Sequence, residues 1–449
     1  MRIETDFAES ALDMALKGGA ESAEIFIKSR AGVSAESKGG APESVKSSED
    51  LAYAIRVFAG GGTGLSYSTR KEDAAEVVRA AIESARHTYK DAASAEAGLP
   101  EGPFEYTEID IYDSEAAQLD SKLVFEKARE VELGATSADP RIKNIRSATA
   151  SFSVSEALIM NTKGVAGSYS ATSASAQVMA VAEEGADTQM GWDFQNSSYL
   201  AGVNFAEVGR KAAGRALELL GAGRTTPSKA MIVIEAPIMA ELLEVLSSML
   251  SAEAVQKGKS LLAGKLGQKI ISPMLNIIDD GLMARRPGSR PFDDEGVAVS
   301  RKALVKNGVL QGYMHNSKTA AKDKIKSTGN GVRPSIMAFP GVGPLNIYLE
   351  NASSQPVSKN SLFSQAGNGV YITNAMGMHT INPISGEFSI GISGLLIEGG
   401  KAGRPVKEMV VSGNVLDLFA SIVALGDDFR FYGEAGSSSA LAGPVDISA

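Results

Sequence analysis

Residue types that do catalysis are scarce in this sequence. The chain of 449 residues has no cysteine and three histidines, which are His87, His315 and His379. A zinc site built on thiolates and a cysteine nucleophile are therefore excluded. Chemistry that depends on histidine is restricted to three positions.

Two short motifs imitate known catalytic patterns. Gly258-Lys259-Ser260 resembles the end of a phosphate-binding loop, but Glu253 stands where the pattern requires its first glycine. Ser68 and Lys71 match the Ser-x-x-Lys pair of some acyl transferases, and helix capping explains this pair better. Neither motif predicts a site.

The most informative stretch runs from residue 371 to residue 432 and is rich in glycine. Its segments at 376–377, 385–389, 394–399 and 411–414 resemble the closing signature of the TldD/PmbA proteins, a metallopeptidase family also called modulators of DNA gyrase. Segments near residues 55–64, 291–297 and 327–331 resemble other parts of the same family. The chain is thus identified as similar to this family over most of its length.

The resemblance also implies where a metal site would lie. Metal-dependent members carry His-Glu-x-x-x-His on the helix after an apolar strand, and a cysteine ligand further on. Alignment on residues 260–267 places the stretch 243–248 at this motif, with Leu243 and Ser248 in place of the two histidines and Glu244 retained. The sequence therefore resembles the PmbA (TldE) branch, and we assign no catalytic residue and expect no metal ligand and no cofactor in this chain.

The family further implies a function and partners. A PmbA-type chain pairs with a TldD-type subunit that carries the zinc, or forms a homodimer when isolated, and the pair cleaves unfolded or modified peptides in a shared cavity. Surface candidates for the substrate or the partner are Met376, Gly377, His379, Gly386 and Gly391. We expect the glycine-rich strands here to accept an extended peptide as an added strand.

Two other functions stay open. The first is a self-sufficient metallopeptidase that uses Glu244, His379 and Asp279 or Asp280, a ligand set that suits magnesium or calcium better than zinc. The second is a regulator without enzymatic activity that binds a protein such as gyrase.

Composition limits the possible partners. The net charge of −9 argues against a broad surface for nucleic acid, which requires clustered lysine and arginine. No stretch approaches the ~20 apolar residues of a membrane helix, and the acidic N-terminus shows no secretory signal. We expect a cytoplasmic protein.

The pattern of apolar residues predicts an α+β fold in three parts. These are an N-terminal α/β domain (1–110), a β-rich middle segment with flanking helices (111–225) and a C-terminal domain of antiparallel sheet with packed helices (226–449). The first part has a helix over 5–17 and a capping box formed by Thr69 and Glu72 before a second helix.

The middle and C-terminal parts carry further local signals. We predict helices over 114–133 and 204–221, with strands and turns between them at 161–164 and 183–185. An apolar strand at 230–234 precedes a helix at 238–250. Asn307-Gly308 and Gly399-Gly400 indicate tight hairpin turns, and a last helix is expected from Asn414, ending at Gly426.

Overall fold

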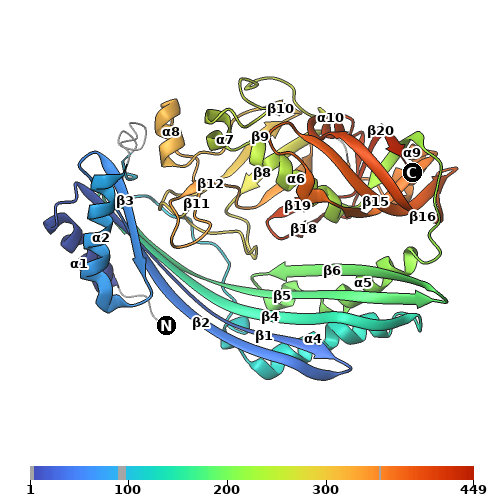
Figure 1. Ribbon diagram of the computed structural model, residues 1–449, viewed down its shortest axis with the longest axis horizontal. Helices are drawn as coiled ribbons and strands as arrows, with labels where there is room; N and C mark the ends of the chain where they lie inside the picture. The colour runs from blue at the N-terminus through green and yellow to red at the C-terminus, as the bar shows by residue number, and fades with distance from the viewer. Residues whose placement is uncertain (1–4, 89–97, 353–354, 449) are drawn as a thin grey trace.

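A large curved antiparallel sheet forms one half of the molecule (Figure 1). The computed structural model describes residues 5–88, 98–352 and 355–448, so most of the acidic N-terminus, in which we expect no secretory signal, lies outside the described residues. The strand order is β3-β2-β1-β4-β5-β6. The strands are β1 (Ser22–Lys38), β2 (Ala41–Ala59), β3 (Gly62–Ser68), β4 (Ile142–Asn161), β5 (Ala166–Glu184) and β6 (Asp187–Ser197). Strands from the first two predicted parts therefore share one sheet.

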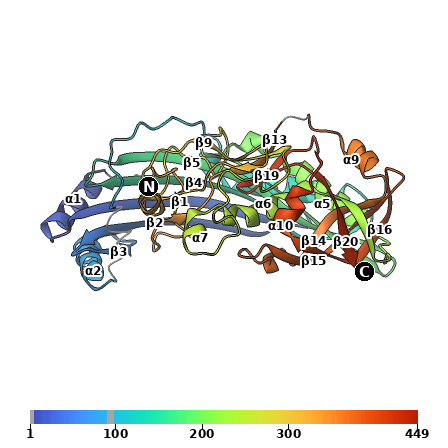
Figure 2. The same cartoon turned by 90° about the horizontal axis from the view of Figure 1, so that it is seen from above.

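Four helices cover one face of this sheet. They are α1 (Thr5–Lys17), α2 (Ala74–His87), α4 (Ser121–Thr136) and α5 (Phe205–Glu218). Ile25, Ile27, Val33 and Ala35 of β1 pack under them, and alternate residues of a strand point to the same face. The other face, which carries Phe26, lies toward the C-terminal part of the chain (Figures 1 and 2).

Of the helix starts predicted in this half, one is confirmed and two are wrong. Asn204 caps α5 as predicted, because its side chain accepts the N–H of Glu207. The predicted start at residue 114 is wrong: a short 3-10 helix, η2 (Ala116–Gln118), comes first, and Asp120 caps α4. The predicted capping box before α2 is also wrong: a 3-10 helix, η1 (Lys71–Asp73), precedes α2, and neither Arg70 before η1 nor Asp73 before α2 makes a side-chain cap.

Two six-stranded sheets form the C-terminal part. One has the order β10-β9-β8-β13-β19-β18, and the other has the order β16-β15-β14-β7-β20-β17, with an added pairing of β16 with β20 that closes it on itself. Most pairs are antiparallel, but β14 runs parallel to β7 and β13 runs parallel to β19. The sheets contain β7 (Ser228–Ile234), β8 (Leu275–Asp280), β9 (Arg301–Lys306), β10 (Val309–Leu310), β13 (Ile347–Asn351), β14 (Gly369–Met376), β15 (Glu387–Glu398), β16 (Lys401–Asn414), β17 (Ala424–Leu425), β18 (Arg430–Tyr432), β19 (Ala435–Ser437) and β20 (Ala440–Ser448).

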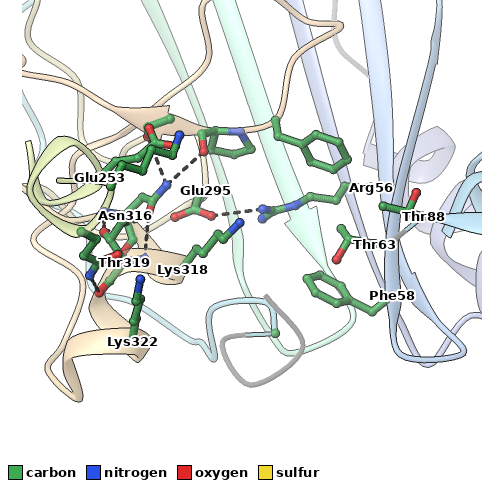
Figure 3. A pocket seen from close by; sticks show the side chains of 16 residues that line it. Arg56, Phe58, Thr63, Thr88, Glu253, Glu295, Asn316, Lys318, Thr319 and Lys322 are labelled. Atoms are coloured by element: carbon green, nitrogen blue, oxygen red, sulfur yellow. Dashed lines mark hydrogen bonds and ion pairs between the residues drawn. The ribbon is translucent and has the colours of Figure 1, made fainter. Parts of the chain in front are cut away.

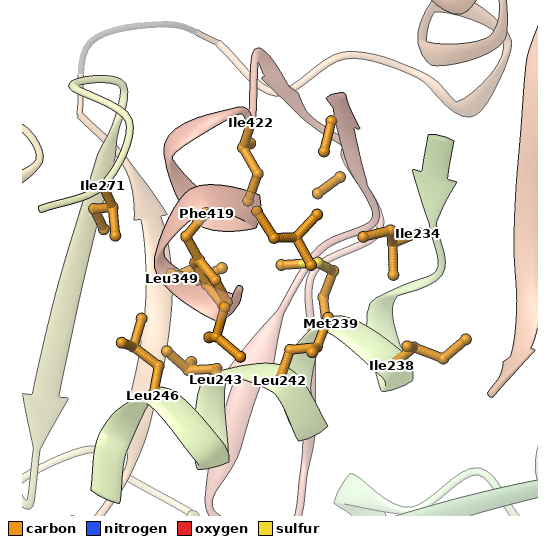
Figure 4. Packing of buried hydrophobic residues seen from close by; sticks show 14 of the residues in the cluster. Ile234, Ile238, Met239, Leu242, Leu243, Leu246, Ile271, Leu349, Phe419 and Ile422 are labelled. Atoms are coloured by element: carbon orange, nitrogen blue, oxygen red, sulfur yellow. The ribbon is translucent and has the colours of Figure 1, made fainter. Parts of the chain in front are cut away.

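The helix α6 (Ala236–Met249) follows β7 directly and packs against both sheets. Its apolar side chains, among them Leu242, Leu243 and Leu246, lie in a core with Leu349 and Phe419 (Figure 4). The remaining short elements are η1 (Lys71–Asp73), η3 (Leu200–Gly202), α7 (Ala252–Gln256), α8 (Ser317–Asp323), β11 (Gly331–Val332), β12 (Gly341–Val342), α9 (Lys359–Ala366), η4 (Met378–Thr380) and α10 (Val415–Ala420).

Both predicted hairpin turns are present. Asn307 and Gly308 have φ of 50° and 76°, and Gly399 and Gly400 have φ of 54° and 78°, which is the left-handed backbone of a two-residue turn. The N-cap role of Asn414 is confirmed as well. The predicted helix end at Gly426 is wrong, because α10 ends at Ala420. Across the described ranges, no helix has the length and apolar character needed to cross a membrane.

Candidate functional site

The positions aligned with the zinc motif lie on α6 and point in different directions. Leu243 is fully buried in the core, whereas Glu244 and Ser248 are exposed. The Ser248 hydroxyl donates to the carbonyl oxygen of Val245 at 2.7 Å within the helix. The stretch therefore keeps its place after an apolar strand but does not direct three donor atoms at one point.

A negative surface surrounds the exposed side of α6. The Glu244 side chain reaches solvent, but the protein around it removes part of its hydration, which raises its pKa, and the carboxylates of Glu241 and Glu434 raise this pKa further. Burial also raises the pKa of Glu434, an effect that the cations of Arg290 and Lys28 oppose. Lys28 belongs to β1, on the sheet face that lies toward the C-terminal part. The carboxylates of Glu241, Glu244 and Glu434 thus lie near the space between the large sheet and the C-terminal part.

The glycine signature forms one end of the closed sheet. Met376 ends β14 and pairs with Gly391 of β15, and its side chain is 61% exposed. Gly377 has φ of 85° and opens η4, which carries the exposed His379. Gly386 is buried with φ of 72° just before β15. The structure therefore brings these five candidates into one neighbourhood, and their role in binding stays a prediction.

Strand addition along this signature needs a correction. From Gly391 to Ile397, β15 pairs with β14 on one side and β16 on the other. A strand with a partner on each side leaves no edge for a third strand, so a peptide cannot add as a strand beside residues 391–394. Strand addition elsewhere between residues 376 and 394 stays a prediction. Only residues 387–390 of β15 extend beyond β14, because β14 ends at Met376.

The candidate metal carboxylates have other partners. Asp279 is fully buried, and its oxygens accept from Lys302 Nζ (3.2 Å), Asn330 Nδ2 (2.8 Å) and the N–H of Leu345 (2.7 Å). Asp280 accepts the N–H of Leu282 at 2.9 Å. Within the described ranges, no three His, Asp or Glu side chains are grouped closely enough to hold a metal ion. These donors do not fit the family's zinc ion.

A buried network of charges joins the two halves. Arg56 of β2 donates to Glu24 of β1 at 2.7 Å and to Glu295 at 3.1 Å. The guanidinium of Arg333 also contacts Glu24, and the backbone N–H of Arg333 donates to Asp294 at 2.7 Å. The sequence alone does not predict this network, because residues 55–57 and 291–297 carry only the family resemblance. Their pairing spans 239 positions of sequence, which no local pattern reveals.

A cavity of about 550 Å³ opens beside this network (Figure 3). In this view Arg56 lies on one side of the cavity, Glu253 of α7 and Lys322 of α8 lie on the other, and Glu295 lies between them. Glu295 also accepts the N–H of Ser317 at 2.7 Å. A ligand in this cavity would contact both halves of the chain.

Comparison with known proteins assigns the class. Models of PmbA/TldA metallopeptidases match the chain in three segments: domain 1 at residues 23–85, the central domain at 112–220 and the C-terminal domain at 227–449. The fold and these matches together define a metallopeptidase-like protein. The chain belongs to the PmbA/TldD family, as the resemblance predicted.

Named relatives agree with this assignment. The metalloprotease PmbA of Escherichia coli O157:H7 is 26% identical over 432 residues, which cover 96% of this chain and 92% of that protein. A structure from Thermotoga maritima is described as a candidate modulator of a DNA gyrase. It superposes on this chain with a TM-score of 0.90 at 28% identity, and the match covers 99% of this chain and 100% of the Thermotoga maritima chain. TldE of Thermococcus kodakarensis has a TM-score of 0.88 at 19% identity over 99% of this chain and 100% of its own, a likeness of fold alone.

Proposed function

We propose that this chain is a PmbA/TldE-type subunit of a cytoplasmic metalloprotease, and that it needs a TldD-type subunit for zinc and for cleavage. The burial of Leu243 carries the proposal. A core leucine stands at the first motif histidine, Ser248 stands at the second, and the chain has no cysteine to replace the third ligand. Three missing donors leave no zinc site of the usual kind.

In this role the chain supplies one wall of a cavity for unfolded or modified peptides. The carboxylates of Glu241, Glu244 and Glu434 favour peptide segments with positive charge. Met376 and His379 add an exposed surface at the end of the closed sheet, which would meet the peptide or the partner subunit. The relatives named as metalloproteases support the peptide as substrate class.

The experiment is digestion of an unfolded peptide by this chain, by a TldD-type partner and by their mixture. We expect cleavage only where the partner is present, with more from the mixture than from the partner alone. Elemental analysis after dialysis is expected to find less than one zinc per chain. Cleavage by this chain alone, inhibited by a chelator, would instead establish a self-sufficient metallopeptidase.

A second candidate function rests on the description of the Thermotoga maritima protein. If this chain regulates a gyrase without proteolysis, it must act through protein contacts, since its net charge is −9. Capture of purified gyrase by this chain without a TldD-type subunit would favour that function. Capture of the TldD-type subunit alone supports the metalloprotease.

A further inference from the structure

The cavity beside the buried charge network is separate from the positions discussed for peptide cleavage. Among its described lining residues, none belongs to the stretch 243–248 of α6 or to the glycine signature at 376–391. Its volume of about 550 Å³ is within the range of sites that hold small molecules. The cavity thus has the size and the position of a ligand site of its own.

The wall formed by α7 and α8 is held in place by side-chain hydrogen bonds. Asn316, at the start of α8, donates to the carbonyl oxygens of Pro340 (3.0 Å) and Gly341 (3.3 Å). Gln256 of α7 donates to the carbonyl oxygen of Thr319 on α8 at 2.8 Å. A preformed wall loses little conformational entropy when a ligand binds.

Lysine side chains line this wall. Lys257 follows the last residue of α7, and Lys322 lies in the last turn of α8. Within the described ranges, the Lys322 ammonium has no hydrogen-bond or ion-pair partner. Lys257 pairs with Glu253 at 2.6 Å, but their side chains are 59% and 41% exposed, so the pair is weak and an anionic ligand can replace it. Lys318 lines the cavity too, and the site does not depend on it.

The kind of cation favours phosphate over carboxylate. A guanidinium binds a planar carboxylate through two parallel N–H bonds, but both terminal nitrogens of Arg56 are occupied, by Glu24 at 2.7 Å and by Glu295 at 3.1 Å. Ammonium groups act as point charges and suit phosphate. The other oxygen of Glu295 accepts the N–H of Ser317 at 2.7 Å, so this carboxylate is already neutralised by donors of the chain.

Phenyl rings supply the apolar part of the cavity. Phe58 of β2 is 8% exposed, and Phe339, two residues before β12, is 48% exposed. A phenyl ring that is half exposed at a cavity wall gains apolar contact when a flat ring stacks on it. Figure 3 shows Phe58 on the side of the large sheet and Lys322 on the side of α8. A ligand with a flat ring and an anionic group would therefore use both sides of the cavity.

We propose that this cavity binds a phosphate monoester that carries a flat ring, of which a nucleoside monophosphate is the simplest example. Its phosphate lies against Lys257 and Lys322, and its ring lies against Phe58 and Phe339. Such a ligand contacts the large sheet and the C-terminal part together, so it also stabilises the folded chain against unfolding. The inference goes beyond the proposed peptidase function and does not depend on it.

Calorimetric titration of the whole chain with AMP tests the class of ligand. We expect AMP to bind one to one, and adenosine and inorganic phosphate to bind at least about tenfold more weakly, because each lacks one half of the ligand. A dipeptide that ends in phenylalanine offers a carboxylate in place of the phosphate and should also bind more weakly than AMP. No binding of AMP at millimolar concentration, or binding of phosphate or the dipeptide as tight as that of AMP, would overturn the proposal.

Substitutions locate the site. Lys322→Gln should weaken the binding of AMP at least about tenfold, because it removes a charged donor to the phosphate. The matched control Lys326→Gln removes the same charge from an exposed lysine that does not line the cavity, and should change the affinity less than about twofold. Phe339→Leu should weaken the binding of AMP and leave that of inorganic phosphate unchanged. Equal weakening by the two lysine substitutions would reveal a general attraction of anions and would contradict the site.

Chemical protection gives an independent measure of position. Acetylation of lysine amines, followed by mass spectrometry with and without AMP, should show slower modification of Lys257 and Lys322. Lys326 should keep its rate, since it does not line the cavity. Equal protection of all three lysines, or protection of none, would place the bound AMP elsewhere and overturn the proposal.

Discussion

Arg56 on β2 and Glu295 in the C-terminal part form a buried ion pair, with Nη1 and Oε1 3.1 Å apart. Both side chains are at least nine-tenths buried, and the same guanidinium contacts Glu24 of β1. A charge enclosed in this way is stable only while its partners remain. The pair therefore fixes how the large sheet and the C-terminal part sit against each other.

We expect Arg56→Met to lower the free energy of unfolding by about 3–5 kcal/mol, because it leaves the carboxylates of Glu24 and Glu295 buried with fewer cations. Urea unfolding followed by circular dichroism measures the change. The matched control is Arg79→Met on α2, whose pair with Glu83 is exposed at 3.5 Å and should cost less than about 1 kcal/mol. Equal effects of the two substitutions would show that the buried network does not hold the halves together.

Asp293 is expected to make stability depend on pH. Burial, together with the carboxylate of Glu295, raises the pKa of Asp293 from its ordinary 3.8 to about 8, although three backbone N–H groups oppose the shift. Between these two values the folded state binds a proton that the unfolded state has released, so the free energy of unfolding falls as pH rises.

The measurement is urea unfolding of the wild type and of Asp293→Asn across this pH range. The variant cannot titrate at this position, so its stability should fall less steeply between pH 4 and pH 8. Parallel curves for the two proteins would mean that Asp293 keeps its charge in the fold.

Restoring the motif histidines should damage the fold at one position and leave it intact at the other. Leu243→His puts a polar ring into a core without hydrogen-bond partners and should cost more than about 2 kcal/mol. Ser248→His lies on the exposed side of α6 and should be close to neutral. Thermal unfolding compares the two, and zinc analysis of the double variant should find no gain of tightly bound metal. A stable double variant with one zinc per chain would contradict the proposed loss of the site.

Sequence reasoning succeeded where a structure depends on a few adjacent residues. The turns at Asn307-Gly308 and Gly399-Gly400 need only positive φ, and Asn204 caps α5 through a residue three positions away. The capping box at Thr69 and Glu72 failed because η1 starts at Lys71 and α2 starts at Ala74, so Thr69 does not stand directly before either helix. A cap depends on the residue at which the helix begins, and a short sequence pattern does not fix that residue.

Pairings between distant segments could not be predicted in this way. The backbone of Gly391 looks accessible in a glycine-rich stretch, yet β14 and β16 enclose it on both sides. The contact of Arg56 with Glu295 depends on how the C-terminal part folds over the large sheet. The strand and the helix that carry residues 243–248 were predicted from the sequence, but the carboxylate of Glu434 beside Glu244 comes from a segment almost two hundred residues away.

Replacement by alanine should destabilise the fold at one glycine of β15 and have little effect at another. A Cβ added at Gly394 would lie 1.8 Å from the carbonyl oxygen of Tyr371 on β14, whereas a Cβ at Gly391 would find its nearest atom, in Met376, at 3.8 Å. Gly394→Ala must push two hydrogen-bonded strands apart and should cost about 3 kcal/mol or more. Gly391→Ala fits in ordinary contact and should change the free energy of unfolding by less than about 1 kcal/mol. Urea unfolding of both variants decides the matter. Similar losses at the two positions would mean that the approach of β14 to β15 at Tyr371 is looser than the structure has it.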